Sequence, residues 1–152
     1  MPEVTEPALA WSPAGPAGAQ QRRPFVDTNV LLYLISADAA KAERAEQVLA
    51  AGIVISVQVL NEFANVARRK HSLGWDELQQ ALDSISHFCE VRDLTLATQQ
   101  SGLALARRYQ LSVYDAMIAA AALDAGCDCL LSEDFQVGQR FDDRLRVFNP
   151  FV

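Results

Sequence analysis

The stretch FVDTNVLLYLI, residues 25 to 35, places three polar residues between two apolar runs. Phe25 and Val26 are typical of a buried strand, and the run from Asn29 to Ile35 is typical of a short helix. Asp27 therefore stands where a strand passes into a helix. A residue in this position is either an ordinary helix N-cap or a functional carboxylate at the end of a strand.

Short β-rich runs alternate with longer segments of helical period along the rest of the chain. This alternation is typical of a parallel sheet whose crossover connections are helices. We predict an α/β fold: a three-layer sandwich in which a short parallel sheet of about five strands is covered by helices on both faces. The predicted strands are 25–26, 53–55, a short strand at Val91, 127–131 and 146–148, and the predicted helices are 29–35, 39–51, 57–70 capped by Ser56, 76–88, 94–109 and 112–126.

Residues 1–24 contain five of the six prolines and show no apolar periodicity. We therefore expect residues 1–23 to form a disordered or loosely attached tail, and residues 24–152 to form one domain. No apolar run reaches the roughly 18 residues of a membrane span, so no membrane association is expected. The odd number of cysteines, three, suits a reducing compartment, and we expect a cytoplasmic protein.

The charge balance restricts the possible partners. Nineteen acidic residues against 13 lysines and arginines give a net charge of −6 and an isoelectric point near 4.8. The long-range field of such a protein repels phosphates. If the chain acts on RNA or DNA, the local sign of the charge must be reversed, and bound divalent cations can do this.

Four acidic residues fall at or near the carboxyl ends of predicted strands, where ligands bind in open parallel sheets. They are Asp27, Glu62, Asp115 and Asp134. Asp27, Asp115 and Asp134 can each be explained as a helix or turn cap. Glu62 cannot, because it lies about two turns inside its predicted helix, and a carboxylate on an apolar side requires a partner such as a cation. Solvent is the alternative partner.

Convergence of these four acids favours a metal site. Clustered carboxylates raise one another's pKa unless a cation neutralises them. Oxygen ligands without histidine or cysteine favour Mg²⁺ or Mn²⁺. The two histidines, His71 and His87, lie outside these segments, so the sequence gives no support to a hydrolase of the Ser-His-Asp or Cys-His type.

The ordered set of segments DTN (27–29), Glu62, YDAMIAAAA (114–122), LLSEDF (130–135) and RVFNPF (146–151) resembles the PIN domain. Within that family it resembles the VapC-type toxins of bacterial toxin–antitoxin pairs. The similarity covers about residues 24–152.

The resemblance implies a metal-dependent endoribonuclease that hydrolyses RNA by a metal-activated water. Asp27, Glu62, Asp115 and Asp134 match the acidic residues of the family, which would act as metal ligands and catalytic residues. The polar residues that match the family's supporting positions are Thr28, Asn29 and Ser132. The resemblance also implies a homodimer and inhibition by a small antitoxin protein.

Some features leave alternatives open. Val137 occupies a position where many relatives have a further acid, and Glu133 competes with Asp134 as the fourth acid. A degenerate domain that kept the fold to bind a protein is one alternative function. An aspartate-based phosphatase is another, but it needs a second aspartate two residues after Asp27, and that residue is Asn29.

Overall fold

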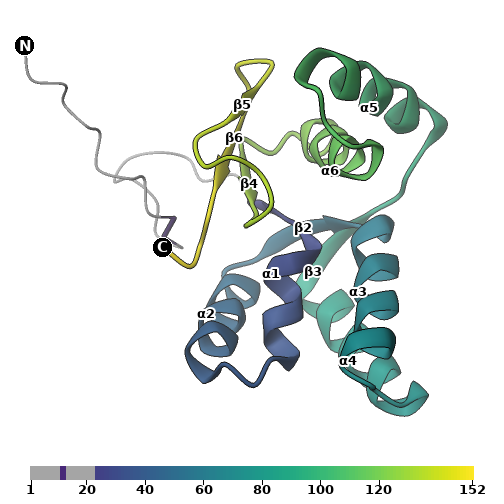
Figure 1. The fold of residues 1–152 in the computed structure, drawn as a ribbon, viewed down its shortest axis with the longest axis vertical. Coiled ribbons are helices and arrows are strands. Elements are labelled where there is room, and N and C mark those ends of the chain that lie inside the picture. The colour runs from purple at the N-terminus through teal and green to yellow at the C-terminus, as the bar shows by residue number, and fades with distance from the viewer. Residues whose placement is uncertain (1–10, 13–22) are drawn as a thin grey trace, which may run out of the picture.

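The computed structural model describes residues 11–12 and 23–152, and in this part of the chain six strands form one sheet (Figure 1). The strand order is β3-β2-β1-β4-β6-β5, and every neighbouring pair is parallel except β5 with β6. The strands are β1 (Phe25–Val26), β2 (Ile53–Ser56), β3 (Cys89–Arg92), β4 (Cys129–Leu131), β5 (Arg140–Phe141) and β6 (Leu145–Phe148).

Helices cover both faces of this sheet. Figure 1 shows α1 to α4 on one side of strands β2 and β3, and α5 and α6 on the other. The predicted three-layer α/β fold is therefore confirmed. The helices are α1 (Thr28–Leu32) with the 3₁₀ turn η1 (Tyr33–Ile35), α2 (Ala39–Ala50), α3 (Val57–Lys70), α4 (Trp75–Phe88), α5 (Leu96–Tyr109) and α6 (Val113–Asp124).

Helix α6 lies between α5 and the sheet (Figure 1), and its alanine-rich sequence explains its burial. A helix that is apolar on all sides can be buried on all sides, and residues 116–123 are all buried. Helix α5 packs closely on it, because a Cβ atom at Gly102 would lie only 2.7 Å from the sulfur of Met117. This packing fixes the first turn of α6, which carries Asp115.

The sheet differs from the prediction in its antiparallel edge strand β5. The turn from β5 to β6 contains Asp142 and Asp143, both with positive φ, at 52° and 53°. Aspartate tolerates this left-handed conformation, but the turn contains no glycine or asparagine that marks it in the sequence. Two smaller corrections concern the start of β4, which is Cys129 rather than Cys127, and Ser56, whose side chain makes no capping hydrogen bond.

The predicted tail, residues 1–23, lies outside the described residues except for Trp11, Ser12 and Arg23. Trp11 is partly buried against the core. The guanidinium of Arg44, on α2, lies 5.3 Å from the centroid of its ring and donates a hydrogen bond of 2.8 Å to its carbonyl oxygen. Trp11 is thus in contact with the domain.

Across the described ranges, each helix is either too short or too polar to cross a bilayer.

Candidate active site

Polar residues from three neighbouring strands meet at the carboxyl edge of the sheet. The register pairs Phe25 with Val54 and Val26 with Leu131, so the residue after β1, Asp27, is level with Ser56 and Ser132. The N–H of Asp27 still donates to the carbonyl of Leu131 at 3.0 Å, which continues the ladder to the end of β1. The backbone of Asp27 is therefore tied to the end of β4.

Asp27 is a helix cap and also a buried carboxyl group. Its Oδ1 accepts a hydrogen bond of 2.7 Å from the Thr28 N–H, and its Oδ2 accepts one of 2.7 Å from Ser132 Oγ. The Asn29 amide lies 3.4 Å from Oδ2. Only 4% of Asp27 is exposed, and this burial raises its pKa to about 7, although the bonds from Ser132 and Thr28 oppose the rise. The charges of Asp134 and Glu62 add to it.

Glu62 turns toward the same edge from the second turn of α3. Its Oε2 accepts a hydrogen bond of 2.8 Å from the Thr28 hydroxyl, and its Oε1 accepts one of 2.9 Å from the Gln58 amide. The partner that the sequence required for Glu62 is thus supplied by two neutral donors. Gln58 also donates to the carbonyl oxygen of Tyr114 at 3.1 Å, which links α3 to the residue before Asp115.

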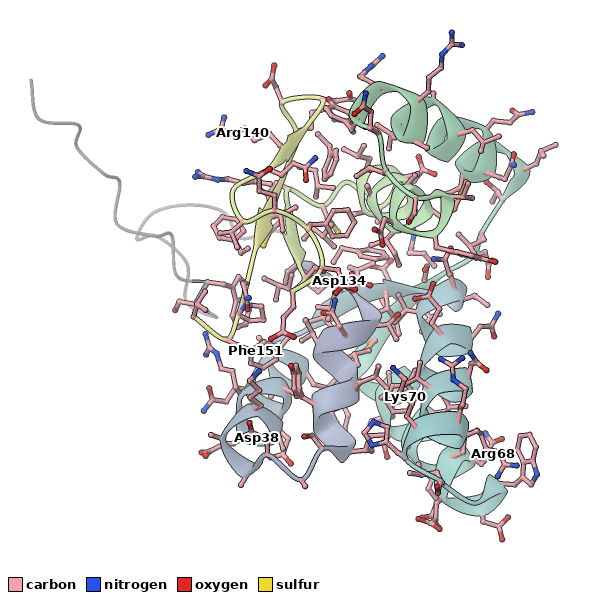
Figure 2. The ribbon with its side chains drawn as sticks, viewed as in Figure 1. Asp38, Arg68, Lys70, Asp134, Arg140 and Phe151 are labelled. Carbon is pink, nitrogen blue, oxygen red and sulfur yellow. The ribbon has the colours of Figure 1, made fainter. Side chains whose placement is uncertain are left out.

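Asp115 and Asp134 complete the group of four acids. Asp115 lies in the first turn of α6, where its N–H donates to Ser112 Oγ at 3.2 Å. Its pKa is raised, first by partial burial and then by the charges of Asp134 and Glu62, while Ser112 opposes the shift. Asp134 is exposed, and Figure 2 shows it beside the first turn of α1. The charges of Asp134 and Glu62 thus act on both Asp27 and Asp115, which places the four acids in one group.

The loop after β4 separates the two candidates for the fourth acid. The N–H of Asp134 donates to Ser132 Oγ at 3.1 Å, which keeps this residue beside Asp27. Glu133 instead accepts a hydrogen bond of 2.7 Å from the Tyr33 hydroxyl, and its carboxylate lies 3.5 Å from the ammonium of Lys41. Glu133 is thus already paired with a cation, and the geometry favours Asp134 as the fourth acid.

The supporting residues form one connected network. Asn29 donates to Ser132 Oγ at 3.2 Å, and its carbonyl oxygen accepts the Glu133 N–H at 3.2 Å. Ser132 is fully buried and bonds both Asp27 and Asp134. The amide at position 29 is therefore committed to holding the loop. Val137 is 54% exposed.

The chemistry of these donors fits a divalent cation. In residues 23–152 none of the four acids forms an ion pair with a lysine or arginine. Burial and neighbouring negative charges raise the pKa of Asp27 and of Asp115. A bound cation would offset both the desolvation of these carboxylates and the repulsion between them. The described residues contain no preformed group of three His, Cys, Asp or Glu side chains placed to hold an ion. The fit therefore rests on the oxygen donors, which suit Mg²⁺ or Mn²⁺.

The fold and the carboxylate edge define an α/β protein with an acidic site at the ends of its parallel strands. The family model of the PIN domain matches residues 25–140. The chain belongs to the PIN domain family.

Solved structures of toxin and toxin–antitoxin proteins share the fold. VapC20 of Mycobacterium tuberculosis, a toxin that cleaves the sarcin–ricin loop, has a TM-score of 0.60 and 22% identity, covering 72% of this chain and 90% of that one. A toxin–antitoxin complex from Klebsiella pneumoniae has a TM-score of 0.63 and 23% identity, with 84% and 97% coverage. VapBC2 from Rickettsia felis, bound to a DNA fragment from its promoter, has a TM-score of 0.64 and 18% identity, with 84% and 98% coverage. No curated protein sequence matches the chain significantly.

Gln58 is the site residue that sequence reasoning missed. It is 8% exposed, and one amide nitrogen bonds both Glu62 and the backbone beside Asp115. The signal in the sequence was its position four residues before Glu62, because residues i and i+4 face each other on a helix.

We expect Gln58→Leu to leave Glu62 Oε1 and the carbonyl of Tyr114 without their donor. The free energy of unfolding should fall by about 1–3 kcal/mol, as for other buried groups left unpaired. Divalent-metal affinity should fall about tenfold, because groups that orient ligands are typically worth this much. Thermal unfolding and calorimetric titration with Mn²⁺ measure the two effects. Gln79→Leu, which removes an i to i+4 bond to Asp83 on exposed α4, is the matched control and should leave metal affinity unchanged.

Proposed function

We propose that this chain is a Mg²⁺-dependent endoribonuclease and the toxin of a VapBC-like type II toxin–antitoxin system. The observation that carries the proposal is the convergence of Asp27, Glu62, Asp115 and Asp134 on one edge of the sheet without a cationic partner in the described residues. Membership of the PIN domain family and structural likeness to VapC toxins support it.

In this proposal the four acids hold Mg²⁺ or Mn²⁺ and are the catalytic residues. A bound divalent ion would lower the pKa of a water molecule and neutralise charge on the phosphate that is attacked. This would account for how a chain with a net charge of −6 could bind RNA at an edge that carries four acids.

The chain's own residues hold the ligands in place. Ser132 donates to Asp27 and accepts from the backbone of Asp134, so one buried hydroxyl sets the spacing between two acids. The Thr28 hydroxyl orients Glu62. Asn29 holds the loop that carries Ser132. These three residues are proposed as the supporting shell of the site.

The proposed partners are an RNA substrate, a small antitoxin protein and a second copy of this chain. Two of the similar structures are toxin–antitoxin complexes, which supports an antitoxin partner. Large apolar side chains exposed on α5 and α6, among them Leu96, Val113 and Tyr114, support a homodimer. We further propose a cytoplasmic protein in which residues 24–152 form the nuclease domain and residues 1–23 a tail.

Cleavage of a labelled RNA by the purified chain tests the activity. We expect cleavage with Mg²⁺ or Mn²⁺, none with excess chelator, and recovery when Mg²⁺ is restored. A short open reading frame next to this gene should encode a protein that binds the chain and suppresses cleavage. Tight binding of that protein together with an absence of cleavage under all metal conditions would instead identify a protein-binding module.

A further inference from the structure

The turn between α3 and α4 exposes a large aromatic ring that packs against an arginine. Trp75, the first residue of α4, is 70% exposed. The guanidinium of Arg68 lies 4.0 Å from the centroid of the indole ring and donates a hydrogen bond of 2.8 Å to the carbonyl of Leu73. Arg68 therefore holds the ring in a fixed position while most of the indole remains open to solvent.

A line of side chains on α3 connects this turn with the carboxylate edge. Arg69 comes seven residues after Glu62, which places both on the same face of the helix, two turns apart. At about 1.5 Å per residue, the two positions are roughly 10 Å apart along the axis. Asn65, between them, is exposed, as is Arg69. An RNA strand with one phosphate at the four site acids can therefore extend along the open face of α3 and reach Arg69.

The charge of Arg69 is available for an outside partner. Within the described ranges it forms no ion pair with an acid. Asp76 and Glu77 lie in the first turn of α4, where their negative charges interact favourably with the helix dipole. Figure 2 shows Arg68 at the end of α3 remote from Asp134, and Lys70 projecting from a different side of the helix, so Lys70 is not included in the surface.

We propose that Arg69 and Trp75, with Arg68 supporting the indole, bind the single-stranded RNA that flanks the cleaved bond. This inference rests on the proposed nuclease function for its substrate. Proteins that bind single strands without reading sequence combine cationic side chains that follow the backbone with aromatic rings on which bases stack. Arg69 contacts a phosphate, and Trp75 stacks with a base beyond it.

Trp75 itself reports the interaction. The sequence has two tryptophans, so Trp11→Phe leaves Trp75 as the sole indole. In a Trp11→Phe, Asp115→Asn variant, we expect a short single-stranded oligoribonucleotide to quench the fluorescence saturably and with a strong dependence on salt. An abasic strand of the same length should bind through its phosphates without quenching.

Arg69→Gln should weaken this binding about tenfold, whereas Arg107→Gln, which removes an exposed arginine from the last turn of α5, should leave it unchanged. In the cleavage assay Trp75→Leu should raise KM about tenfold with kcat within about twofold, and Trp75→Tyr should restore most of the loss. Unchanged thermal unfolding of these exposed-site variants excludes a folding defect.

The outcomes separate this inference from the nuclease proposal. A chain that cleaves RNA but shows no quenching, or one in which the Arg69 and Trp75 variants match the wild type, overturns the proposed surface and leaves the activity. Quenching without cleavage supports the surface and counts against the activity. Quenching by an antitoxin protein but not by RNA assigns the surface to a protein partner and overturns the inference.

Discussion

Asp115→Asn is expected to lower kcat for RNA cleavage by about a thousandfold. This corresponds to several kcal/mol of transition-state stabilisation, which the charge of a metal ligand can supply. The fold should be retained, because α6 is anchored by its buried alanine-rich body rather than by this side chain. Loss of a charge at the helix start costs little, and relief of repulsion from Asp134 and Glu62 offsets it. Cleavage kinetics and thermal unfolding measure the two quantities.

Ser112→Ala separates the two roles that the sequence allows for this segment. The Ser112 hydroxyl accepts the N–H of Asp115, so its removal deletes the helix cap while keeping the carboxylate. We expect a loss of about 1 kcal/mol in stability with most of the cleavage retained. Asp83→Asn, an exposed position on α4, controls for the change of net charge. Wild-type activity in Asp115→Asn would remove this residue from the proposed site.

Asp27→Asn is expected to stabilise the metal-free protein near and above pH 7. The pKa of Asp27 is raised to about 7 in the folded protein by burial, against about 4 in the unfolded chain. A carboxyl whose folded pKa is raised contributes stability that is present below pH 4 and is lost as the pH rises to about 7. The difference of about three pKa units between the folded and unfolded states corresponds to a loss of at most about 4 kcal/mol in the free energy of unfolding.

Unfolding midpoints measured in chelator between pH 4 and 8 test this prediction. The wild type should lose stability across the window, and Asp27→Asn should lose less. An asparagine has one acceptor oxygen in place of two, so with its oxygen on the Thr28 N–H it can no longer accept from Asn29 and Ser132, which reduces the gain. Added Mg²⁺ should stabilise the wild type most at the alkaline end, because it binds the ionised form. A wild type whose stability rises from pH 4 to 7 in chelator would contradict the assignment of a buried, cation-deficient Asp27.

Most of the fold follows from local pattern. The alternation of apolar strand runs with helices predicts the first four parallel strands, since the connections between them are helical. The fifth, β6, was predicted from its apolar run alone, because β5 and no helix lies between it and β4. The edge strand β5 was missed because its turn uses Asp142 and Asp143 in a left-handed conformation. Nothing in residue spacing marks that turn, since its geometry depends on pairing with β6 rather than on a local glycine.

The candidate site was predictable in composition but not in its connections. Because parallel strands end at the same edge of a sheet, Asp27 and Ser132 were expected to lie close together. The register of β1 with β4 places them side by side. The pairing of Glu133 with Tyr33 joins residues a hundred positions apart, which spacing cannot reveal. The exposed indole of Trp75 could not be predicted either, because exposure depends on how the α3–α4 turn packs.

Calorimetric titration of the wild type with Mn²⁺ just below pH 7, in two buffers of different ionisation enthalpy, tests the central claim most directly. The carboxylate edge should bind the ion and release protons on binding, because Asp27, with a pKa of about 7, must ionise to become a ligand. Asp27→Asn should bind more weakly and release fewer protons. Binding that is absent in the wild type, or equal in both proteins, would contradict a metal site built from these acids.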